Sequence, residues 1–381
     1  MGLSAESIST LDTISTTEWN LLVNNTNPFL KHEFLAGLER FHCLEPHGWK
    51  ACHIVIYEAD KLVGALPLYF KTNSNGEFVF DWTWAEAYER AGGRYYPKLV
   101  SAVPFTPVTG SRLLISPDYS NKKAISDLII KTSTELMIEN NLSGLHYLFP
   151  DQNDIITLKQ SGHLLRMGCQ YHWFNQEYND FNDYLGALNT KRRKQINRER
   201  KSVRESNIKI EILKGNEIDD EQWRIFYQFY CSTFLRKWGE PRLTLNFFKS
   251  LSKYLPESTL LLLAKHNGEY VAGAYAMQSS DVLYGRHWGC SKQFQYLHFE
   301  LCYYQTIEYC INHDLKRLDA GAQGEHKISR GFTPVRTWSA HCIRESQFRE
   351  AIKDYLQQEQ IYIDQYIESL LKHSPYKHII S

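Results

Sequence analysis

Two stretches of the chain show the same alternation of apolar runs and polar turns. HIVIYEADKLVGALPLYFK begins at His53, and LLLLAKHNGEYVAGAYAMQ begins at Leu260. Each stretch has an apolar run, a short polar turn and a second apolar run with a glycine early in it, Gly64 in the first and Gly273 in the second. This pattern predicts a β-hairpin in each place.

The order of elements after each hairpin also repeats. Helical spacing of apolar residues predicts helices at about 122–140 and about 297–313, each followed by a short strand that begins at Leu145 or Leu315. A short basic segment with a glycine comes next in both cases. We therefore predict an α/β (α+β) protein of two duplicated halves with mixed, mainly antiparallel sheets, and we expect a functional site at the cleft between the halves.

The boundaries of the two halves follow from this repeat. We predict a first half at 1–170 and a second half at 171–345 that opens with a basic helix at 181–205. The remaining segment, 346–381, has apolar residues at helical spacing and predicts an amphipathic C-terminal helix packed on the body of the protein.

Composition excludes several classes of function. The 381 residues include 43 basic and 43 acidic side chains, so no overall charge attracts the protein to DNA or to an anionic membrane. The 8 cysteines have neither CxxC nor zinc spacing, so we expect no metal site. The N-terminus lacks a signal sequence, and no apolar run has the roughly 20 residues that span a bilayer, so we expect a cytoplasmic protein without a membrane span. Hydrolase, NTPase and metalloprotease motifs are also absent from the sequence.

The segment KRRKQINRERKSVR, from Lys191, is the most basic part of the chain, with eight basic residues and one acidic residue. On a helix, Leu185, Ile196 and Val203 share one stripe, and Arg192 lies beside it, so we expect Arg192 to face inward. Outward charges such as Lys194 form either a solvated face or a patch that contacts phosphates, and both interpretations stay open.

Several stretches together resemble a known family. They are the basic helix and WAEAYERAGGRYYPKL from Trp84, VPFTPVTGSRLL from Val103, LYGRHWGC from Leu283, LHFELCYYQTIEY from Leu297 and AGAQGEHKISRGF from Ala320. This combination covers most of the chain and is similar to an uncharacterised FemAB-related family, itself similar to Fem-type peptidoglycan aminoacyl transferases and GNAT-like acyltransferases. The resemblance implies two tandem GNAT-like folds and an N-acyltransferase activity.

The donor implied by this resemblance is acyl-CoA or aminoacyl-tRNA. Coenzyme A-using GNAT enzymes have a glycine-spaced basic loop that holds the pyrophosphate. The equivalent segment here, from Arg286 to Lys292, has only one glycine, which argues against coenzyme A and keeps aminoacyl-tRNA open. We expect Arg192, Arg286 and Trp288 to contact the donor, and we expect no tightly bound cofactor.

The segment from Gly321 to Gly331 is the richest in candidate chemistry. It follows a predicted strand and places four ionisable side chains close together. Amide formation needs a base for the attacking ammonium and donors for the oxyanion. Glu325 or His326 is the candidate base, and Lys327, Arg330 or the Gly324 N–H is the candidate oxyanion donor. A polar turn without catalytic function is the alternative.

Two further groups are candidates for the site. Glu300 lies in an otherwise apolar and aromatic helix, so it needs a partner such as Arg286 or Arg330, or it has a raised pKa suited to proton transfer. In the first half, a polar and aromatic segment with Gly92 and Gly93 predicts a binding loop for a polar, ring-bearing ligand, although a plain surface loop is the alternative. Its residues are Trp82, Trp84, Glu86, Tyr88, Arg94, Tyr95, Tyr96 and Lys98.

Taken together, the sequence predicts acyl or aminoacyl transfer from an activated ester or thioester to a small-molecule or peptide-like amine. The alternative from another class is a non-catalytic RNA- or tRNA-binding module that uses the basic helix at 191–204. An enzyme needs the segment that begins at Gly321, whereas an RNA-binding module needs only the basic face.

Overall fold

The chain folds into two compact units, and each is described by itself. The structure is a computed structural model that describes residues 2–23, 27–236, 239–321 and 323–377. Unit 1 comprises Met1–Gly168 and Arg336–Gln365, and unit 2 comprises Cys169–Val335 and Tyr366–Ser381. The divisions fall inside β9 (Leu164–Phe174), β15 (Thr333–Ile343) and α12 (Ser346–Leu371). Ala322, in the predicted catalytic segment, lies outside the described residues.

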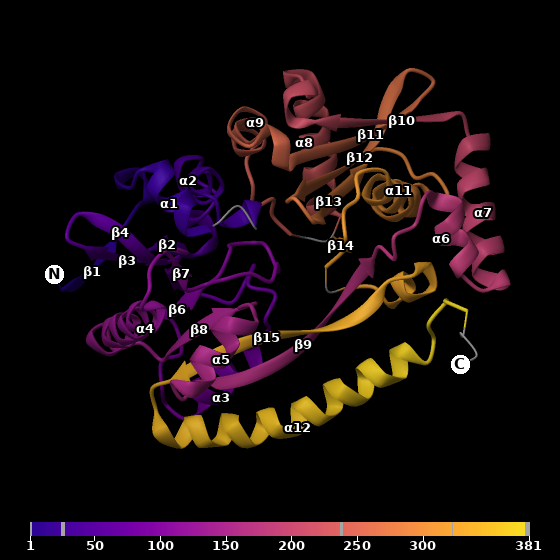
Figure 1. The fold of residues 1–381 in the computed structure, drawn as a ribbon. Coiled ribbons are helices and arrows are strands. Elements are labelled where there is room, and N and C mark those ends of the chain that lie inside the picture. The colour runs from indigo at the N-terminus through magenta and orange to yellow at the C-terminus, as the bar shows by residue number, and fades with distance from the viewer. Residues whose placement is uncertain (1, 24–26, 237–238, 322, 378–381) are drawn as a thin grey trace. The chain divides into compact units, whose positions relative to one another are not determined.

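Unit 1 has mainly antiparallel strands with helices packed on them (Figure 1). Besides parts of β9, β15 and α12, its elements are β1 (Leu3–Ile8), α1 (Thr16–Val23), α2 (His32–Arg40), β2 (Trp49–Ala51), β3 (His53–Glu58), β4 (Lys61–Leu66), β5 (Tyr69–Lys71), α3 (Trp82–Arg90), β6 (Lys98–Ser101), β7 (Leu114–Ile115), α4 (Lys122–Glu139), β8 (Gly144–Leu148) and α5 (Gln152–Gln160). The order β1-β3-β4-β7 is wholly antiparallel, and in β15-β8-β6-β5-β2 only β6 and β8 are parallel. Helix α4 packs on β3 and β4.

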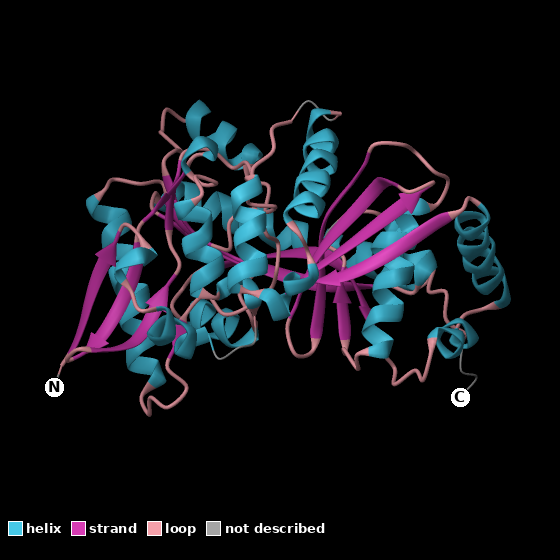
Figure 2. Cartoon of the chain, turned by 90° about the horizontal axis from the view of Figure 1, so that it is seen from above, coloured by secondary structure: helices cyan, strands magenta, loops and turns pink. Residues whose placement is uncertain are grey.

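Unit 2 has helices on both faces of its strands (Figure 1 and Figure 2). Its further elements are α6 (Phe181–Ala187), α7 (Thr190–Glu205), β10 (Ile208–Lys214), α8 (Asp220–Leu235), α9 (Leu245–Tyr254), β11 (Thr259–His266), β12 (Glu269–Gln278), β13 (Val282–Cys290), α10 (Leu297–Phe299), α11 (Gln305–Asn312) and β14 (Arg317–Asp319). The strand order is β10-β11-β12-β13-β14-β9, and only β13 and β14 pair in parallel.

Strand periodicity explains why the sheet of unit 2 is covered on both faces. Successive side chains of a strand point to opposite faces. Leu260 and Leu262 of β11 join the core that includes Ile307 of α11. Tyr275 of β12 instead packs against Phe248 of α9, on the face that α8 also covers. This second face holds α8 and α9, and the first holds α6, α7 and α11.

Both predicted hairpins are confirmed. The first pairs β3 with β4 and the second pairs β11 with β12, and both are antiparallel. In each, the register shifts two residues before the end of the first strand, between Ile56 and Tyr57 or between Ala264 and Lys265. The predicted mixed α/β class with mainly antiparallel sheets is therefore correct, while the internal duplication stays a prediction.

The predicted C-terminal helix is also confirmed, as α12. In unit 1 its Ile352 and Leu356 pack in a cluster with Trp84 and Tyr88 of α3. In unit 2 its Leu370 joins the main core. Within the described ranges, no helix is long and apolar enough to cross a membrane.

The predicted basic helix at 181–205 is two helices and not one. Leu188 has extended backbone angles and ends α6, and the Asn189 side chain caps α7 by accepting a hydrogen bond from the Arg192 N–H at 3.1 Å. Asparagine competes well for such N–H groups, so it starts a new helix where a continuous one was expected.

Candidate active site

The segment after β14 forms a compact turn with two exposed and two buried ionisable side chains. Glu325–Arg330 is a short 3-10 helix that ends at Gly331. Glu325 and His326 are exposed, whereas Lys327 and Arg330 are only 4% and 3% exposed. Two of the four candidate catalytic side chains, Lys327 and Arg330, therefore belong to the core of unit 2.

His326 is held by a tyrosine of the neighbouring helix. The hydroxyl of Tyr303 lies 3.0 Å from Nε2 of His326. Partial burial, together with the charges of Arg330 and Lys327, lowers the pKa of His326 below its ordinary value of 6.5. Burial raises the pKa of Tyr303, so this phenol stays neutral. At neutral pH the imidazole is uncharged and can accept a proton.

Gly324 makes room for the His326 ring. Its φ is +100°, and a Cβ added there would lie 2.4 Å from Cε1 of His326. No side chain fits that distance, so the imidazole rests directly over the main chain. Gly324 thus supports the site by its missing side chain.

Aromatic rings extend from His326 to β13. His298 lies 6.4 Å from His326 and 5.2 Å from Trp288 between ring centroids, and Phe299 lies 5.5 Å from His326. Residues Glu300–Tyr304 form a π-helical segment, a widened turn that often occurs at functional sites. The structure therefore brings the predicted Trp288 into one ring cluster with His326.

Arg330 is fully occupied by protein groups. Its Nη2 lies 2.9 Å from both carboxylate oxygens of Glu199, and its Nε donates to the Tyr304 hydroxyl at 2.9 Å. Nη1 donates to the His326 carbonyl at 2.9 Å, and the guanidinium stacks on Phe299 at 3.6 Å. Tyr304 also donates to Glu199. With all of its donors used, Arg330 supports the turn and does not offer a donor to an oxyanion.

Lys327 stabilises the start of the segment by hydrogen bonds to the main chain. Its Nζ donates to the carbonyl oxygens of Ala320 and Gly321 at 2.5 and 3.3 Å, and it lies 5.5 Å from the Tyr171 ring. Burial lowers the pKa of Lys327 to about 8. The ammonium therefore fixes the path of the chain between β14 and Gly324.

Glu325 is held by a pair of tyrosines of unit 2, Tyr366 of α12 and Tyr171 of β9. The Tyr366 hydroxyl donates to the Glu325 carboxylate at 2.8 Å, and the Tyr171 hydroxyl lies 3.0 Å from that of Tyr366. Glu325 is exposed, so its carboxylate is accessible to a ligand while it is held in one direction.

Glu300 has a different partner from those expected. Its carboxylate lies 3.2 Å from the guanidinium of Arg200 and accepts from Gln305 Nε2 at 2.8 Å. Neither expected partner contacts Glu300, because Arg330 pairs with Glu199 and Arg286 lies beside Tyr275 and Tyr230. Burial raises the pKa of Glu300, and its second oxygen has no hydrogen-bond partner among the described residues.

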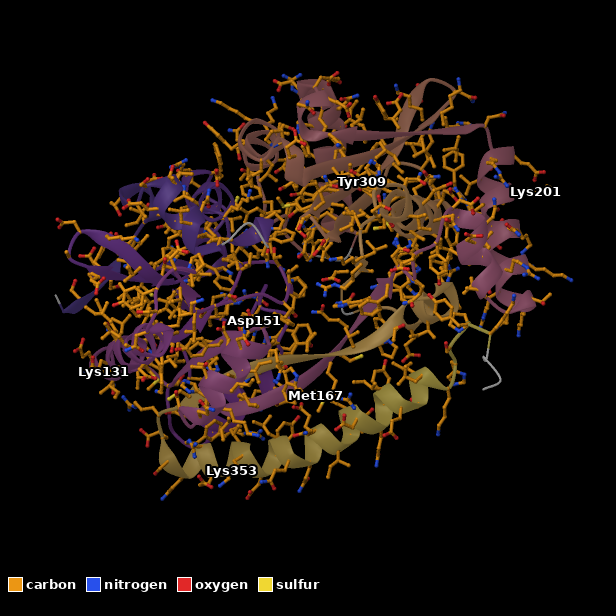
Figure 3. All side chains as sticks on the ribbon, viewed as in Figure 1. Lys131, Asp151, Met167, Lys201, Tyr309 and Lys353 are labelled. Carbon is orange, nitrogen blue, oxygen red and sulfur yellow. The ribbon has the colours of Figure 1, made fainter. Side chains whose placement is uncertain are left out.

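Helix α7 turns one acidic side chain inward and most of its cations outward. Glu199 is buried beside Ile196 and Val203, whereas Arg192 is half-buried. Arg192 donates to Gln195 at 2.9 Å, and Gln195 donates to Glu199 at 2.9 Å. Arg192 is therefore linked to Arg330 through two side chains. The exposed cations are Lys191, Lys194, Arg198, Lys201 and Arg204, and Figure 3 shows Lys201 on the outer side of α7.

Arg286 and Trp288 do not share one environment. Arg286 lies beside Tyr275 and Tyr230, on the face covered by α8 and α9, and burial lowers its pKa to about 10. Trp288 faces His298 on the opposite side. The two expected donor contacts therefore belong to different faces of β13.

The aromatic segment of unit 1 is mostly a helix, and the expectation of a loop is wrong there. Trp82–Arg90 forms α3, and Glu86 on it is exposed. Tyr95 and Lys98 are buried, and Lys98 pairs with Glu77 at 2.9 Å and with Asp81 at 2.5 Å.

A groove of about 680 Å³ nevertheless lies beside this segment. Arg94 and Tyr96 line it, as does the turn that contains Gly92 and Gly93. Of the predicted binding residues, Tyr88, Arg94 and Tyr96 therefore line an open space, whereas Tyr95 and Lys98 help to hold the surrounding structure.

Sequence reasoning missed several residues around His326. Tyr303 and Phe299 carried a signal, since they lie four residues apart in an aromatic helix. Glu199 carried a clearer one, because it is the single acid of the basic segment and shares the stripe of Ile196 and Val203. Gln195 and Arg200 gave no signal that separates them from their neighbours.

Residues 10–378 match the family FemAB_like, described as peptidoglycan biosynthesis/recognition. Two solved structures show a similar fold. The crystal structure of FemX is 12% identical, has a TM-score of 0.57 and covers 93% of this chain and 100% of its own. The structure of L-PGS from Bacillus licheniformis is 10% identical, has a TM-score of 0.54 and covers 87% of this chain and 92% of its own. No curated protein matches the sequence.

Proposed function

Because the chain belongs to the FemAB-like family of peptidoglycan biosynthesis and recognition, we propose that it is an N-acyltransferase that uses His326 as its general base. The observation that carries this proposal is the exposed imidazole of His326, which is uncharged at neutral pH and is fixed between Tyr303 and Gly324. A fixed, neutral imidazole can take the proton that an attacking ammonium must lose.

The reaction follows from these groups. His326 takes a proton from the acceptor ammonium, and the freed amine attacks the carbonyl carbon of the activated ester or thioester. The C–N bond forms, the C–O or C–S bond breaks, and the leaving oxygen or sulfur receives the second proton that the attacking nitrogen loses. Tyr303 orients the imidazole, and the main-chain N–H of Gly324 is the proposed oxyanion donor. Arg330 and Lys327 hold the turn in place.

We propose aminoacyl-tRNA as the first donor to test, with acyl-CoA as the second. The exposed cations of α7 support a donor with several phosphates, since each such contact adds affinity that falls with salt. Arg198 and Lys194, for example, make no ion pair with another described residue. The acceptor is proposed to be a small-molecule or peptide-like amine.

A matched pair of histidine variants tests the base. His326→Ala should lower turnover roughly 10²- to 10³-fold, as expected for the loss of a general base. His313 is also an exposed histidine of unit 2, stacked on Tyr309, and His313→Ala should leave turnover within about twofold. Glu325→Gln keeps an acceptor for Tyr366 and should retain activity. If Glu325→Gln is the inactive variant and His326→Ala is active, the base is Glu325.

The same exposed cations favour a second function, an RNA-binding module without catalysis. Native mass spectrometry with charged tRNA and with acyl-CoA separates the two proposals. An enzyme should convert a bound donor to product when an amine is added. A module should bind tRNA with a strong salt dependence and leave the aminoacyl ester intact.

A further inference from the structure

We propose that the groove of unit 1 beside α3 is a binding site for a monocarboxylate with an apolar or aromatic body. Its volume of about 680 Å³ is in the range of small-molecule sites. The residues that carry the argument are Tyr88, Arg94, Tyr96, Arg344, Glu345 and Phe348. The proposal rests on this groove alone and does not depend on acyl transfer.

The charges of the groove favour one negative charge. Three charged side chains line it, Arg94, Arg344 and Glu345. Arg344 is paired with Glu345 at 3.2 Å, so these two charges largely cancel. Arg94 uses its Nε for the Tyr96 carbonyl at 2.9 Å, and its outer nitrogens make no hydrogen bond to a described residue. A guanidinium edge of this kind binds a carboxylate with two parallel hydrogen bonds.

The start of α12 also favours a negatively charged ligand in the groove. The helix begins at Ser346, and its first turn has no acidic side chain. Gln347 and Phe348 of that turn line the groove. The first turn of α12 therefore borders the same space as Arg94, and the positive end of a helix dipole favours a nearby anion.

The groove also has a preformed apolar wall. The rings of Tyr88 and Phe348 meet edge to face with centroids 4.9 Å apart, and both belong to a buried cluster or pack against it. Gly93 allows the turn to approach this wall, since a Cβ there would lie 2.3 Å from Cε1 of Tyr88. Tyr96 also lines the groove, and its hydroxyl is held by Ser74 at 2.7 Å. Walls fixed in this way bind a flat apolar body without reordering.

Binding of indole-3-acetate to the 381-residue chain tests the proposal. Isothermal titration should give a Kd on the order of 1 mM, as expected for a ligand of this size. Indole-3-acetamide lacks the charge and acetate lacks the ring, so each should bind at least about tenfold more weakly.

Three variants locate the site. Arg94→Gln should weaken indole-3-acetate binding at least about tenfold, whereas Arg90→Gln, at an exposed position of α3 outside the groove, should have no effect. Ala351→Trp places a large ring in the groove from an exposed position of α12 and should abolish binding without a change in thermal unfolding. Absence of indole-3-acetate binding at about 10 mM, ten times the expected Kd, would overturn the proposal. Equal affinity for the amide, or unchanged binding in Arg94→Gln or Ala351→Trp, would overturn it too.

Discussion

The buried pair of Glu199 and Arg330 should be one of the strongest single determinants of stability in unit 2. Replacing either partner by methionine keeps the volume and removes the charge. In Glu199→Met, the guanidinium of Arg330 stays only 3% exposed and loses both of its carboxylate contacts at 2.9 Å. Breaking a buried pair from one side costs about 3–5 kcal/mol of unfolding free energy.

The Tyr304 hydroxyl places the expected loss near the upper end of that range. Tyr304 donates to Glu199 and accepts from Arg330, so its hydroxyl loses a partner in either variant. An unsatisfied buried hydroxyl adds about 1–3 kcal/mol. The double variant Glu199→Met/Arg330→Met has no stranded charge, so it should cost clearly less than the sum of the two single losses.

Urea unfolding of the three variants measures these losses, and hydrogen exchange of α7 amides assigns the transition to unit 2. The expected result is a double-mutant cycle with a favourable coupling energy between Glu199 and Arg330. Single losses below about 1 kcal/mol, the size of an exposed pair, would refute the reasoning. Arg330 would then again be a candidate donor to the oxyanion.

Three further results are expected. Gly324→Ala should lower turnover about as much as loss of His326, because the added Cβ displaces the His326 ring. Gly268 also has a positive φ, but a Cβ there would meet no other atom within 4 Å, so Gly268→Ala should lower only stability. Arg192→Ala should lower thermal stability because Arg192 is linked to the turn, whereas Lys194→Ala should leave stability nearly unchanged and only weaken the salt dependence of donor binding; an equal loss of thermal stability in the two variants would contradict this. A pH profile of kcat/KM should fall on the acid side with an apparent pKa below 6.5, since burial, Arg330 and Lys327 lower the pKa of His326 and only the neutral ring is a base; an acid limb above pH 7 would contradict this assignment.

Hydrophobic patterning predicted the elements of the fold well because it depends on local periodicity. The hairpins at His53 and Leu260, the helix α4 and the helix α12 follow from apolar spacing alone. The break between α6 and α7 did not, because a single asparagine cap outweighed a continuous amphipathic pattern. The same limit applies to Trp82–Arg90, where aromatic and glycine content indicated a loop while the spacing of Trp84 and Tyr88 fits a helix face.

Contacts between side chains far apart in the sequence were harder to predict than the helices and strands themselves. The region around His326 was found from its own residues, but its hydrogen bond to Tyr303 depends on how α10 and α11 pack on the sheet. Glu300 was correctly expected to need a cation, yet three arginines were available and the structure uses Arg200. Which of several like side chains pairs with a buried charge depends on distances that the sequence does not contain.

Chemical rescue is the most direct test of His326 as the general base. The measurement is the initial rate of acyl transfer to an amine by His326→Ala, with and without added imidazole, using the donor that the wild-type protein accepts. We predict that the variant is roughly 10²- to 10³-fold slower, that neutral imidazole restores part of the rate, and that His313→Ala neither loses activity nor responds to imidazole. Wild-type turnover by His326→Ala, or a loss of activity that no concentration of imidazole relieves, would contradict the account.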